Sequence, residues 1–529
     1  MPDQPIAEQL AKGQREISIS EFFTRNRHLL GFDNPARALL MTVKEAVDNA
    51  LDATADMKVL PEIKLAIEQL SETRFKVTIE DNGPGIVKEQ IPNIFAKLLY
   101  GSKFHTLKQN RGQQGIGISA AVLYSQLTTG KPTRITSRIS PKKPSHYYEL
   151  NIDTKRNEPV IAKELEVEWE KDHGTKIEIE LEAKYLKGKQ SVDEYVKQTA
   201  IANPHATLIY FNPEKEKVEY LRGTNQLPIE SKAIKPHPHG IELGTLIKML
   251  HDTTSTTLKS FLQNDFSRIG SGTAKGICQQ ANLYEKARPA KIAQQEAEAL
   301  FKALQAAKVI APPTDCLSPI TNNILEKGLR KEIQADFYVA ITRPPTVYRG
   351  FPFQVEAAIA YGGELDKEGQ VRLMRFANRV PLLYQQGACA ITEAVTDNNW
   401  KPYGLQQSGN NLPAGPAVII VHIASVWVPF TSEAKEAIAH YDDIIKEIKL
   451  VLQECGRKLA TYIRHNVKNA EQKERIGLFE KYIPELASSL ATLSDEKKTV
   501  IEENLKKILK KSMSSLLEEN GVVNDKEKK

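Results

Sequence analysis

Cysteine is scarce in this sequence, with four residues among 529. Cys278, Cys316, Cys389 and Cys455 stand far apart and form no CxxC pair. This spacing argues against a disulfide framework and against a zinc site built on paired cysteines. We therefore expect four reduced cysteines that pack in the interior.

Long apolar runs are also missing. The longest apolar stretch, residues 416–430, contains His422 and Ser425 and is shorter than the roughly 20 residues of a membrane-spanning helix. It predicts a buried strand instead. The N-terminal segment shows no apolar core followed by a small-residue cleavage site, which is the mark of a signal peptide. We expect no signal peptide, no membrane partner and residence in the cytoplasm.

Neither sign of charge dominates. The 72 basic residues exceed the 66 acidic ones to give a net charge of +6, which is a slight excess for a chain of this length. Such a charge permits a nucleic-acid partner without proving one. A hydrophobic fraction of 41% is typical of a globular protein, and the length favours about three domains.

The first strong signal is a helix start. Asn34 followed by Pro35 has the pattern of an N-cap and a first helical residue, and residues 36–56 continue helically. The predicted core-facing side consists of Val43, Ala46, Val47, Ala50 and Leu51.

Alternating and periodic segments predict an α+β layer after this helix. Residues 75–81 alternate apolar and polar side chains, as a half-buried strand does, and the glycines that follow end the strand. Further along we expect an apolar helix (91–101), a polar glycine-rich loop (102–117), a second helix (118–127) and two strands (175–181 and 206–211).

The rest of the chain predicts a helical insertion and a second α+β domain. A proline- and glycine-rich hinge at 235–240 precedes short helices, and its two histidines fit a plain loop better than a metal site. Strands are expected at 335–343, 353–363, 370–380 and 417–428, followed by a long amphipathic helix over 432–465 and a charged amphipathic helix near the end.

Three polar residues recur at helical spacing in the first helix. Glu45, Asn49 and Asp52 stand at i, i+4 and i+7, which places them on one stripe opposite the apolar side. One interpretation is a solvated helix face, the commoner meaning of such a stripe. The other is a set of ligands for a bound molecule.

Asp81 shares the phase of the apolar residues of the strand over 75–81, so its carboxylate is expected on the buried side. A buried carboxylate requires a donor. The exocyclic amine of adenine would be such a donor, and an Asx turn is the simpler alternative. Gly83 and Gly85 would let the backbone approach a flat ligand, and Thr175 is expected to face the same interior.

Two further features favour an anionic ligand. The loop RGQQGIGIS (111–119) leads directly into a helix, so its free N–H groups and the positive end of the helix would face one spot. Glycines also serve turns and close packing, which makes this pattern weak evidence by itself. Lys435 falls in the first turn of the predicted long helix, where either an anionic partner or the neighbouring Glu433 and Glu436 would compensate its charge.

Four motifs in a fixed order make the combination specific. They are EAVDNALDA (45–53), DNGPGI (81–86), RGQQGIGIS (111–119) and HGT (173–175). Together they resemble the nucleotide site of the Bergerat-fold (GHKL) ATPases, a superfamily that includes type II topoisomerase ATPase subunits, the mismatch-repair protein MutL, heat-shock chaperones and histidine kinases.

A narrower resemblance covers most of the chain. Several segments look like those of the B subunits of type IIB DNA topoisomerases, the topoisomerase VI family, while the tail after about residue 470 carries no matching motif. The segments are KEAVDNALDA (44–53), LLYGSKFH (98–105), GISAAVLYSQL (117–127), NRVPLLYQ (378–385) and VPFTSEAKEAIA (428–439).

The resemblance implies residue roles. Glu45 would be the general base that orients and deprotonates the water attacking the γ-phosphate of ATP, Asn49 would ligate Mg²⁺, and Asp81 would read adenine. Lys435 would reach the γ-phosphate from another domain and act in catalysis. The other implied cofactor-binding residues are Gly85, Thr175 and the lid residues Ser102, Lys103, Arg111, Gly112, Gln113, Gln114, Gly115, Ile116, Gly117 and Ile118.

The implied architecture is α+β. It comprises a Bergerat-fold ATP-binding domain with an N-terminal strap (1–234), a small helix-two-turn-helix domain (235–312), a ribosomal protein S5 domain 2-like transducer domain ending in a long helix (313–470), and a charged helical segment that contacts the A subunit (471–529).

The implied activity is that of the ATPase subunit in an A2B2 topoisomerase. ATP would join two B subunits into a gate that captures one DNA duplex. Hydrolysis would drive this duplex through a double-strand break made by the A subunit, which relaxes supercoils and decatenates DNA. The sequence has no evident DxDxD-type acidic cluster, so we do not expect the chain to cut DNA alone.

Two alternatives remain. One is an ATPase clamp or chaperone, similar to MutL or to the heat-shock chaperones, without topoisomerase activity; the NRVPLLYQ segment and the helical insertion after residue 235 speak against it. The other is a non-catalytic nucleotide-dependent DNA-binding or scaffold protein. Such a protein would dispense with the base, but Glu45 is present.

Overall fold

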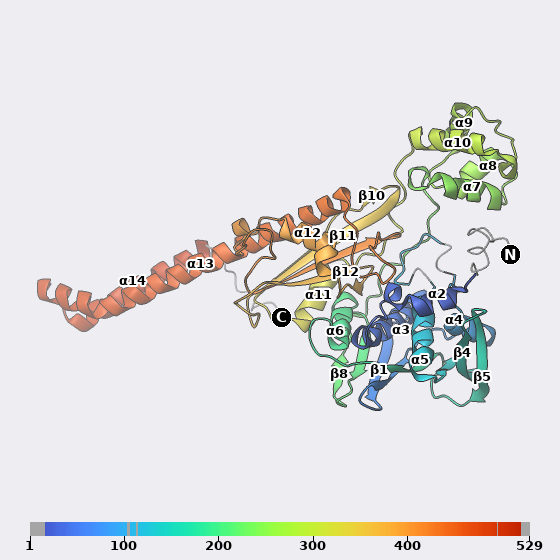
Figure 1. Cartoon of the computed structure of the whole chain (residues 1–529). Helices are drawn as coiled ribbons and strands as arrows, with labels where there is room; N and C mark the ends of the chain where they lie inside the picture. Colours follow the sequence, from blue (N-terminus) through green and yellow to red (C-terminus); the bar gives the residue numbers. More distant parts are fainter. Residues whose placement is uncertain (1–15, 103–105, 113–114, 495, 520–529) are drawn as a thin grey trace, which may run out of the picture. The chain divides into compact units, whose positions relative to one another are not determined.

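The computed structural model describes residues 16–102, 106–112, 115–494 and 496–519, with side chains to residue 509 (Figure 1). The chain divides into two compact units, of which one ends at Gly456 and the other begins at Arg457. Three predicted lid residues, Lys103, Gln113 and Gln114, lie outside the described residues, as do residues 1–15 at the start of the predicted strap.

The first α+β layer is built on a mixed sheet. Within the described residues its eight strands follow the order β5-β4-β3-β6-β2-β1-β7-β8, and only the β1–β7 pair is parallel. The elements are α2 (Ile19–Arg25), α3 (Pro35–Met57), β1 (Glu62–Gln69), β2 (Arg74–Glu80), α4 (Ile91–Ala96), α5 (Gly117–Thr129), β3 (Thr133–Arg138), β4 (Ser145–Asp153), β5 (Glu158–Val167), β6 (Gly174–Glu182), α6 (Val192–Ala202), β7 (Thr207–Phe211) and β8 (Lys217–Tyr220).

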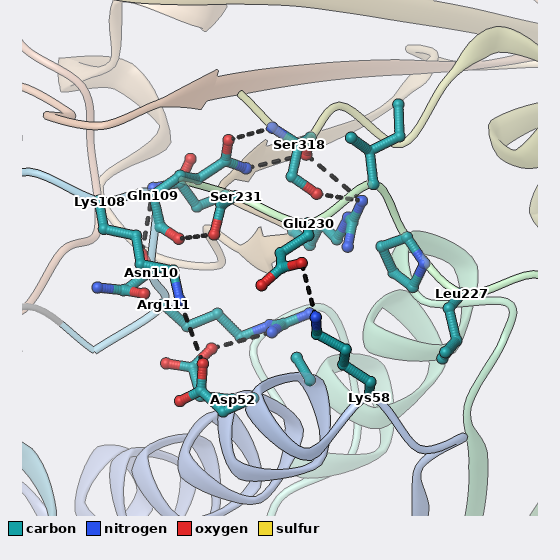
Figure 2. Close-up of a pocket in the computed structure, with 16 residues that line it drawn as sticks. Asp52, Lys58, Lys108, Gln109, Asn110, Arg111, Leu227, Glu230, Ser231 and Ser318 are labelled. Atoms are coloured by element: carbon teal, nitrogen blue, oxygen red, sulfur yellow. Dashed lines mark hydrogen bonds and ion pairs between the residues drawn. The ribbon is translucent and has the colours of Figure 1, made fainter. Parts of the chain in front are cut away.

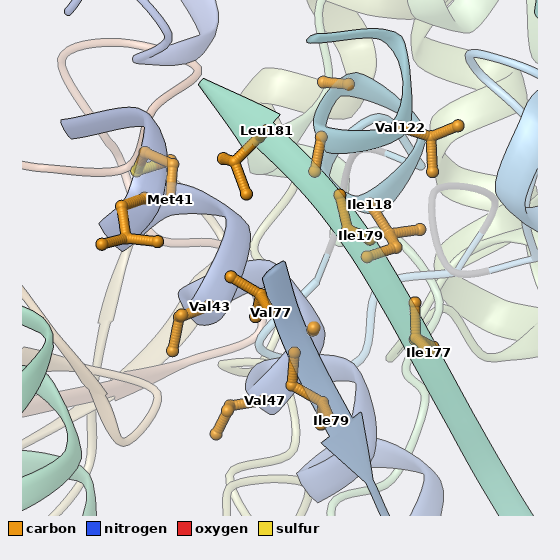
Figure 3. Packing of buried hydrophobic residues seen from close by; sticks show 14 of the residues in the cluster. Met41, Val43, Val47, Val77, Ile79, Ile118, Val122, Ile177, Ile179 and Leu181 are labelled. Atoms are coloured by element: carbon orange, nitrogen blue, oxygen red, sulfur yellow. The ribbon is translucent and has the colours of Figure 1, made fainter. Parts of the chain in front are cut away.

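Helix α3 begins as the sequence predicts. The Asn34 side chain accepts a hydrogen bond from the Arg37 N–H, Pro35 occupies the first turn, and Lys58 ends the helix in a left-handed conformation. The apolar sides of α3 and α5 pack on the sheet (Figure 3). The labelled core residues in that view are Met41, Val43, Val47, Val77, Ile79, Ile118, Val122, Ile177, Ile179 and Leu181.

Helix α4 is shorter than predicted. The sequence favoured a helix over 91–101, but α4 ends at Ala96 because Lys97 is extended and Leu99 has a positive φ of 59°. Both features depend on backbone conformation, which the apolar pattern of this segment does not report.

A separate small core holds the helical insertion together. Its elements are η4 (Pro238–Gly240), α7 (Leu243–Asp252), α8 (Leu258–Asp265), α9 (Ser271–Gln280), η5 (Pro289–Lys291) and α10 (Gln294–Ala306). The ring nitrogens of His237 and His239 bond the carbonyl groups of Ile310 and Ala307, so the two histidines are structural.

The second α+β layer follows. Its elements are α11 (Asn322–Glu332), β9 (Phe337–Thr342), β10 (Thr346–Tyr348), β11 (Phe351–Tyr361), β12 (Arg372–Ala377), β13 (Val380–Pro381), α12 (Ala390–Thr396) and β14 (Ala417–Ser425). The described strands lie in the order β10-β11-β14-β12-β13, with β9 also paired to β11. Every residue of β14 is buried, which confirms the strand predicted for this apolar stretch.

The two layers share a tight junction. Ile201 and Ala202 at the end of α6 belong to the same buried cluster as Leu325 and Leu329 of α11. Gly328 lies at the closest approach, because a Cβ built there would be 2.3 Å from the Ile201 carbonyl oxygen. The layers therefore pack as one body rather than as separate lobes.

The predicted start of the long helix is wrong. Helix α13 spans Asp442–Leu493, and Lys435 lies in the loop before it rather than in a first helical turn. Lys435 has a positive φ of 54°, and the loop is closed by the Thr431 N–H to Ala437 carbonyl bond and by a bridge between Phe430 and Ile438. Buried residues at helix-like intervals extended the predicted periodicity backward into this hairpin-like loop.

The C-terminal part of the described chain is helical. Helix α13 continues past the predicted end at 465, and α14 (Lys498–Glu519) confirms the charged amphipathic helix expected near the end. Among the described residues, every helix is too short or too polar to span a bilayer.

Candidate functional site

A cavity of about 500 Å³ lies where α3, α5, the end of β2 and the loop before α13 meet. The predicted site residues that the structure describes gather in its wall, with one exception among them: the Arg111 side chain turns away. The residues brought together are Glu45, Asn49, Asp81, Gly85, Ser102, Gly112, Gly115, Ile116, Gly117, Ile118, Thr175 and Lys435. Two residues of the α3 stripe, Glu45 and Asn49, therefore line this cavity, and the third, Asp52, is buried against Arg111.

Glu45 lies against the N-terminus of α5. A Cβ built on Gly117, the first residue of that helix, would be 1.7 Å from Glu45 Oε2, so only glycine fits beside this carboxylate. The free N–H groups and the dipole of the helix end stabilise a negative charge at this point. The start of α5, where the sequence predicts an anion, is thus occupied by the carboxylate of Glu45 in this structure.

The charge of Glu45 is matched by two ammonium groups. Lys44 Nζ lies 3.3 Å from Glu45 Oε1 and 3.7 Å from Asp48 Oδ2. Burial opposes ionisation, but Lys44 and then Lys435 outweigh it and lower the pKa of Glu45 below its ordinary value. Glu45 is therefore ionised at neutral pH and free of a proton, as a base must be.

Lys435 enters the cavity from the second α+β layer. Its side chain is buried, and Nζ donates a 3.1 Å hydrogen bond to the carbonyl of Arg111 in the glycine-rich loop. Burial lowers the pKa of Lys435, while the charge of Glu45 acts in the opposite direction. The sequence left open whether an anionic partner or Glu433 and Glu436 compensate this charge; in the structure the carboxylates that act on Lys435 are those of α3.

The loop that carries Lys435 is anchored by an ion pair. Glu436 Oε1 accepts from Arg37 Nη2 at 2.6 Å and from Arg37 Nε at 2.9 Å, and Arg37 also pairs with Asp33 at 2.6 Å. Arg37 stands in the first turn of α3, eight residues before Glu45 on the same helix. The helix that bears the candidate base therefore also holds the loop that bears the lysine.

Asp81 is buried just after β2 and points into the cavity. Its Oδ1 accepts the N–H of Gly83 at 2.7 Å and the N–H of Thr175 at 3.3 Å. The bond to Gly83 is the Asx turn that the sequence left open, and it coexists with an inward carboxylate. Burial raises the pKa of Asp81 to about 6, against the lowering effect of these two bonds.

The glycines after Asp81 are required by close packing as well as by the proposed approach of a ligand. A Cβ on Gly85 would be 2.0 Å from the carbonyl oxygen of Arg138, and one on Gly83 would be 3.1 Å from the Cβ of Ala53. Gly85 does line the cavity and has a φ of 70°. Close backbone packing therefore already requires glycine at Gly85, whatever ligand lies beside it.

Consecutive residues of the glycine-rich loop form hydrogen bonds with the second layer. Gln109 exchanges two bonds with the Ser318 backbone, at 2.9 Å and 2.7 Å, and the carbonyl of Asn110 accepts from Asn378 at 3.1 Å. The next carbonyl, that of Arg111, accepts from Lys435. Three consecutive loop residues thus contact three separate segments of the second layer.

The residues present fit a magnesium ion that arrives with a nucleotide. Asn49 lines the cavity with its amide, and its Oδ1 lies 3.5 Å from the Cβ position of Gly112 in the glycine-rich loop. Magnesium keeps several waters and takes few protein ligands when phosphate oxygens are available. A single amide oxygen beside the loop is consistent with that preference.

Comparison with known proteins shows which families the chain resembles. A family model described as "Topoisomerase VI B subunit, transducer" matches residues 312–475, and one described as "Histidine kinase-, DNA gyrase B-, and HSP90-like ATPase" matches residues 34–185. The sequence is 52% identical over 488 residues to the B subunit of type 2 DNA topoisomerase 6 from Methanococcoides burtonii, covering 92% of this chain and 78% of that protein.

Two further relatives carry the same name. The protein of Methanosarcina mazei is 51% identical, with 92% of this chain and 79% of that protein covered. The protein of Archaeoglobus fulgidus is 46% identical, with 94% and 82% covered.

Sequence reasoning missed three parts of the site. The Arg37–Glu436 pair joins residues 399 positions apart, and no local pattern reports such a contact. Lys44 is the neighbour of Glu45 in the sequence, but the sequence does not show that its ammonium group points toward the Glu45 carboxylate. Arg111, predicted to contact the cofactor, instead directs its guanidinium to Asp52 at 3.0 Å and to Asn203 at 2.6 Å. Only the backbone carbonyl of Arg111 contacts Lys435 at the cavity.

We expect Asp81→Asn to weaken the binding of ATP about tenfold at pH 7.5, or about 1.4 kcal/mol. An asparagine would keep Oδ1 on its two N–H donors and turn its amide NH₂ toward the amine of adenine. Because ionised Asp81 is the better acceptor and its pKa is about 6, the wild-type advantage should shrink as pH falls from 7.5 to 5.5.

Fluorescence titration with a labelled ATP analogue at each pH measures this advantage. The ratio of the two affinities is the quantity to compare, since titration of the nucleotide phosphates affects both proteins alike. Equal affinities at pH 7.5, or a ratio that does not change with pH, would remove Asp81 as the adenine acceptor.

Proposed function

Because this chain belongs to the topoisomerase VI B subunit family, the ATPase subunits of type IIB DNA topoisomerases, we propose that its cavity hydrolyses ATP to operate a gate for DNA. The single observation that carries the proposal is the meeting of Glu45 and Lys435 at the start of α5. Glu45 belongs to the ATPase layer and Lys435 to the transducer layer. A ligand in this cavity would contact both.

We infer that Glu45 is the general base. Its ionised carboxylate stands beside the N-terminus of α5, where phosphates would bind. It accepts a proton from the attacking water as the water oxygen bonds to the γ-phosphorus, and the bond from that phosphorus to the bridging oxygen of ADP breaks. Lys44 holds one carboxylate oxygen and leaves Oε2 for the water.

Lys435 is proposed to stabilise the charge on the γ-phosphate and to report its loss. Its ammonium lies within the electrostatic reach of Glu45 and contacts the Arg111 carbonyl. An anion with a third phosphate would draw this ammonium from the carbonyl, and release of the phosphate would return it. The state of the nucleotide would then be read by the transducer layer through one side chain.

Nucleotide contacts follow from the cavity wall. Asp81 would accept from the adenine amine, with Thr175 and Gly85 beside it, and Asn49 would provide an oxygen ligand to Mg²⁺, which neutralises phosphate charge when bound. The backbone of Gly112, Gly115, Ile116, Gly117 and Ile118 would face the phosphates, together with Ser102. The lid residues Lys103, Gln113 and Gln114 are proposed from the family resemblance alone.

We propose an A2B2 assembly acting on double-stranded DNA in the cytoplasm. ATP would bring two B subunits together to capture one duplex, and the A subunit would cut the other. Transmission toward the A subunit would begin with the bonds of the glycine-rich loop to Ser318, Asn378 and Lys435. A clamp or chaperone would share the ATP cavity, but the match to a topoisomerase transducer favours the topoisomerase.

Helix α13 offers a surface for the A subunit. In the second unit, Leu478, Tyr482, Leu486 and Leu490 recur every four residues and are each at least 40% exposed, while Ile483 and Ala487 are buried. A four-residue repeat on a helix forms one continuous apolar stripe. We propose that the A subunit covers this stripe, because exposed apolar rows of this kind mark interaction sites.

The function is tested with Glu45→Gln. We expect this variant to bind ATP normally but to hydrolyse it at least about 100-fold more slowly, because the amide accepts no proton from water.

With a co-purified A-type subunit, wild type should decatenate linked DNA circles in repeated cycles, and the variant should not. Glu68→Gln, at an exposed position of β1, is the matched control. Unchanged ATP turnover in Glu45→Gln would remove this residue as the base, and ATP hydrolysis without decatenation would favour the clamp alternative.

The A-subunit surface is tested with Leu486→Glu. A carboxylate in the middle of the apolar stripe should weaken association with the A subunit at least about tenfold, because burying an unpaired charge is costly. Ser488→Glu adds the same charge to the exposed opposite side of α13, about 200° around the helix, and should not matter. Sedimentation of the mixed subunits measures association. Equal association of both variants would contradict the proposed surface.

A further inference from the structure

A second cavity, of about 320 Å³, lies behind the glycine-rich loop and is separate from the ATP cavity. Figure 2 shows Arg111 and Asp52 on one side, Lys58 and Glu230 on another, and Ser318 of the second layer above them. Its walls come from α3, the loop before α5, residues 227–231 and the second layer. The volume suits a small molecule.

The charges that line this cavity do not balance. Three of its cations have carboxylate partners: Lys58 pairs with Glu230 at 2.9 Å, Lys108 with Asp56 at 3.3 Å, and Arg111 with Asp52 at 3.0 Å. The fourth cation is Arg379. Within the described part of the chain its guanidinium makes no ion pair, and it donates only to Ser318 O, Ser318 Oγ and Pro319 O.

Arg379 is also deeply buried, at 7% exposure. Burial, followed by the charge of Arg111, lowers the pKa of Arg379 to about 9, so it stays charged at neutral pH. Burial together with the same two guanidinium groups lowers the pKa of nearby His205 to about 2. The two buried guanidinium groups thus repel one another. Arg111 is in contact with Asp52, whereas the carboxylate that acts on Arg379, that of Glu356, does so from beyond ion-pair distance. A buried charge of this kind is stabilised by an anion.

Arg379 has an unfavourable backbone conformation. Asn378 and Arg379 form the two-residue turn between β12 and β13, with φ values of 48° and 67°. This turn prefers Asn followed by Gly, because both residues are left-handed. Arginine in the second position is strained, because a side chain disfavours the left-handed conformation. The strain and the buried guanidinium without an ion pair among the described residues together point to a role for Arg379 beyond making the turn.

We propose that this cavity binds a small anion carrying a phosphate group, with Arg379 as its counter-charge and Arg111 and Lys108 beside it. Inorganic phosphate and a nucleoside monophosphate share this chemistry and both fit the volume. DNA does not fit, because the guanidinium groups of Arg111 and Arg379 are more than nine-tenths buried and a duplex backbone cannot reach them. The Arg111 carbonyl contacts Lys435, so the bound anion lies one residue from the ATP site.

The test is calorimetric titration of the full chain, with the ATP cavity first saturated by a non-hydrolysable ATP analogue and magnesium in excess. Inorganic phosphate and AMP are titrated separately, which distinguishes the two sources. We expect one further site per chain for at least one of them, with a Kd below about 1 mM. No heat from either probe in wild type would overturn the proposal.

Arg379→Gly is the decisive variant. It removes the guanidinium and relieves the left-handed strain, so the fold should tolerate it while anion affinity falls at least tenfold. Ser231→Asp provides a second route: Ser231 lines the cavity, and a fixed carboxylate there should also abolish binding. Arg343→Gln is the matched control, since it removes a transducer arginine that pairs with Glu447 and lines neither cavity.

The outcomes separate cleanly. Loss of binding in Arg379→Gly and Ser231→Asp, with binding retained in Arg343→Gln, supports the site. Wild-type affinity in both cavity variants overturns it. Equal weakening in all three variants also overturns it, because the effect would then follow net charge and not the cavity.

Discussion

The contact of Lys435 with the glycine-rich loop is the constraint on which the site depends. A buried ammonium is stable only with carboxylates and acceptors around it, and removing one partner of a buried pair costs about 3–5 kcal/mol. Lys435 finds Glu45 and the Arg111 carbonyl, and the Arg37–Glu436 pair fixes its loop. Charges on α3 therefore hold the loop that carries Lys435. A phosphate bound at the start of α5, as we propose, would disturb this balance.

The glycine-rich loop is where the two layers and the two cavities meet. On one side its backbone faces the ATP cavity, and on the other the Arg111 side chain lines the anion cavity. Its bond with Asn378 holds it to the turn that carries Arg379, and its bonds with Ser318 hold it to a residue that Arg379 contacts. A displacement at Gly112 would, in the function we propose, be passed directly to the transducer layer through these bonds.

Much of this arrangement could be predicted from the sequence, because local rules govern it. The cap at Asn34, the stripe of Glu45 and Asn49, and the inward phase of Asp81 follow from helix and strand periods, and the structure confirms each placement.

The loop of Lys435 could not be predicted. Its left-handed residue and its bridge between Phe430 and Ile438 interrupt a periodicity that looks helical. Long-range partners were also beyond prediction. The direction of the Arg111 side chain depends on Asp52 and Asn203, which are 59 and 92 positions away. Local sequence patterns report which face a residue takes, and tertiary packing decides which partner it finds there.

A lysine from the transducer layer completes the proposed ATP site, and the ATP turnover of Lys435→Ala tests this most directly. Nucleotide affinity is measured in parallel, with the exposed Lys446→Ala as control. We expect turnover at least about tenfold below wild type, with affinity changed by less than about threefold, because the lysine acts on the γ-phosphate charge and not on adenine. Wild-type turnover in Lys435→Ala would contradict this role.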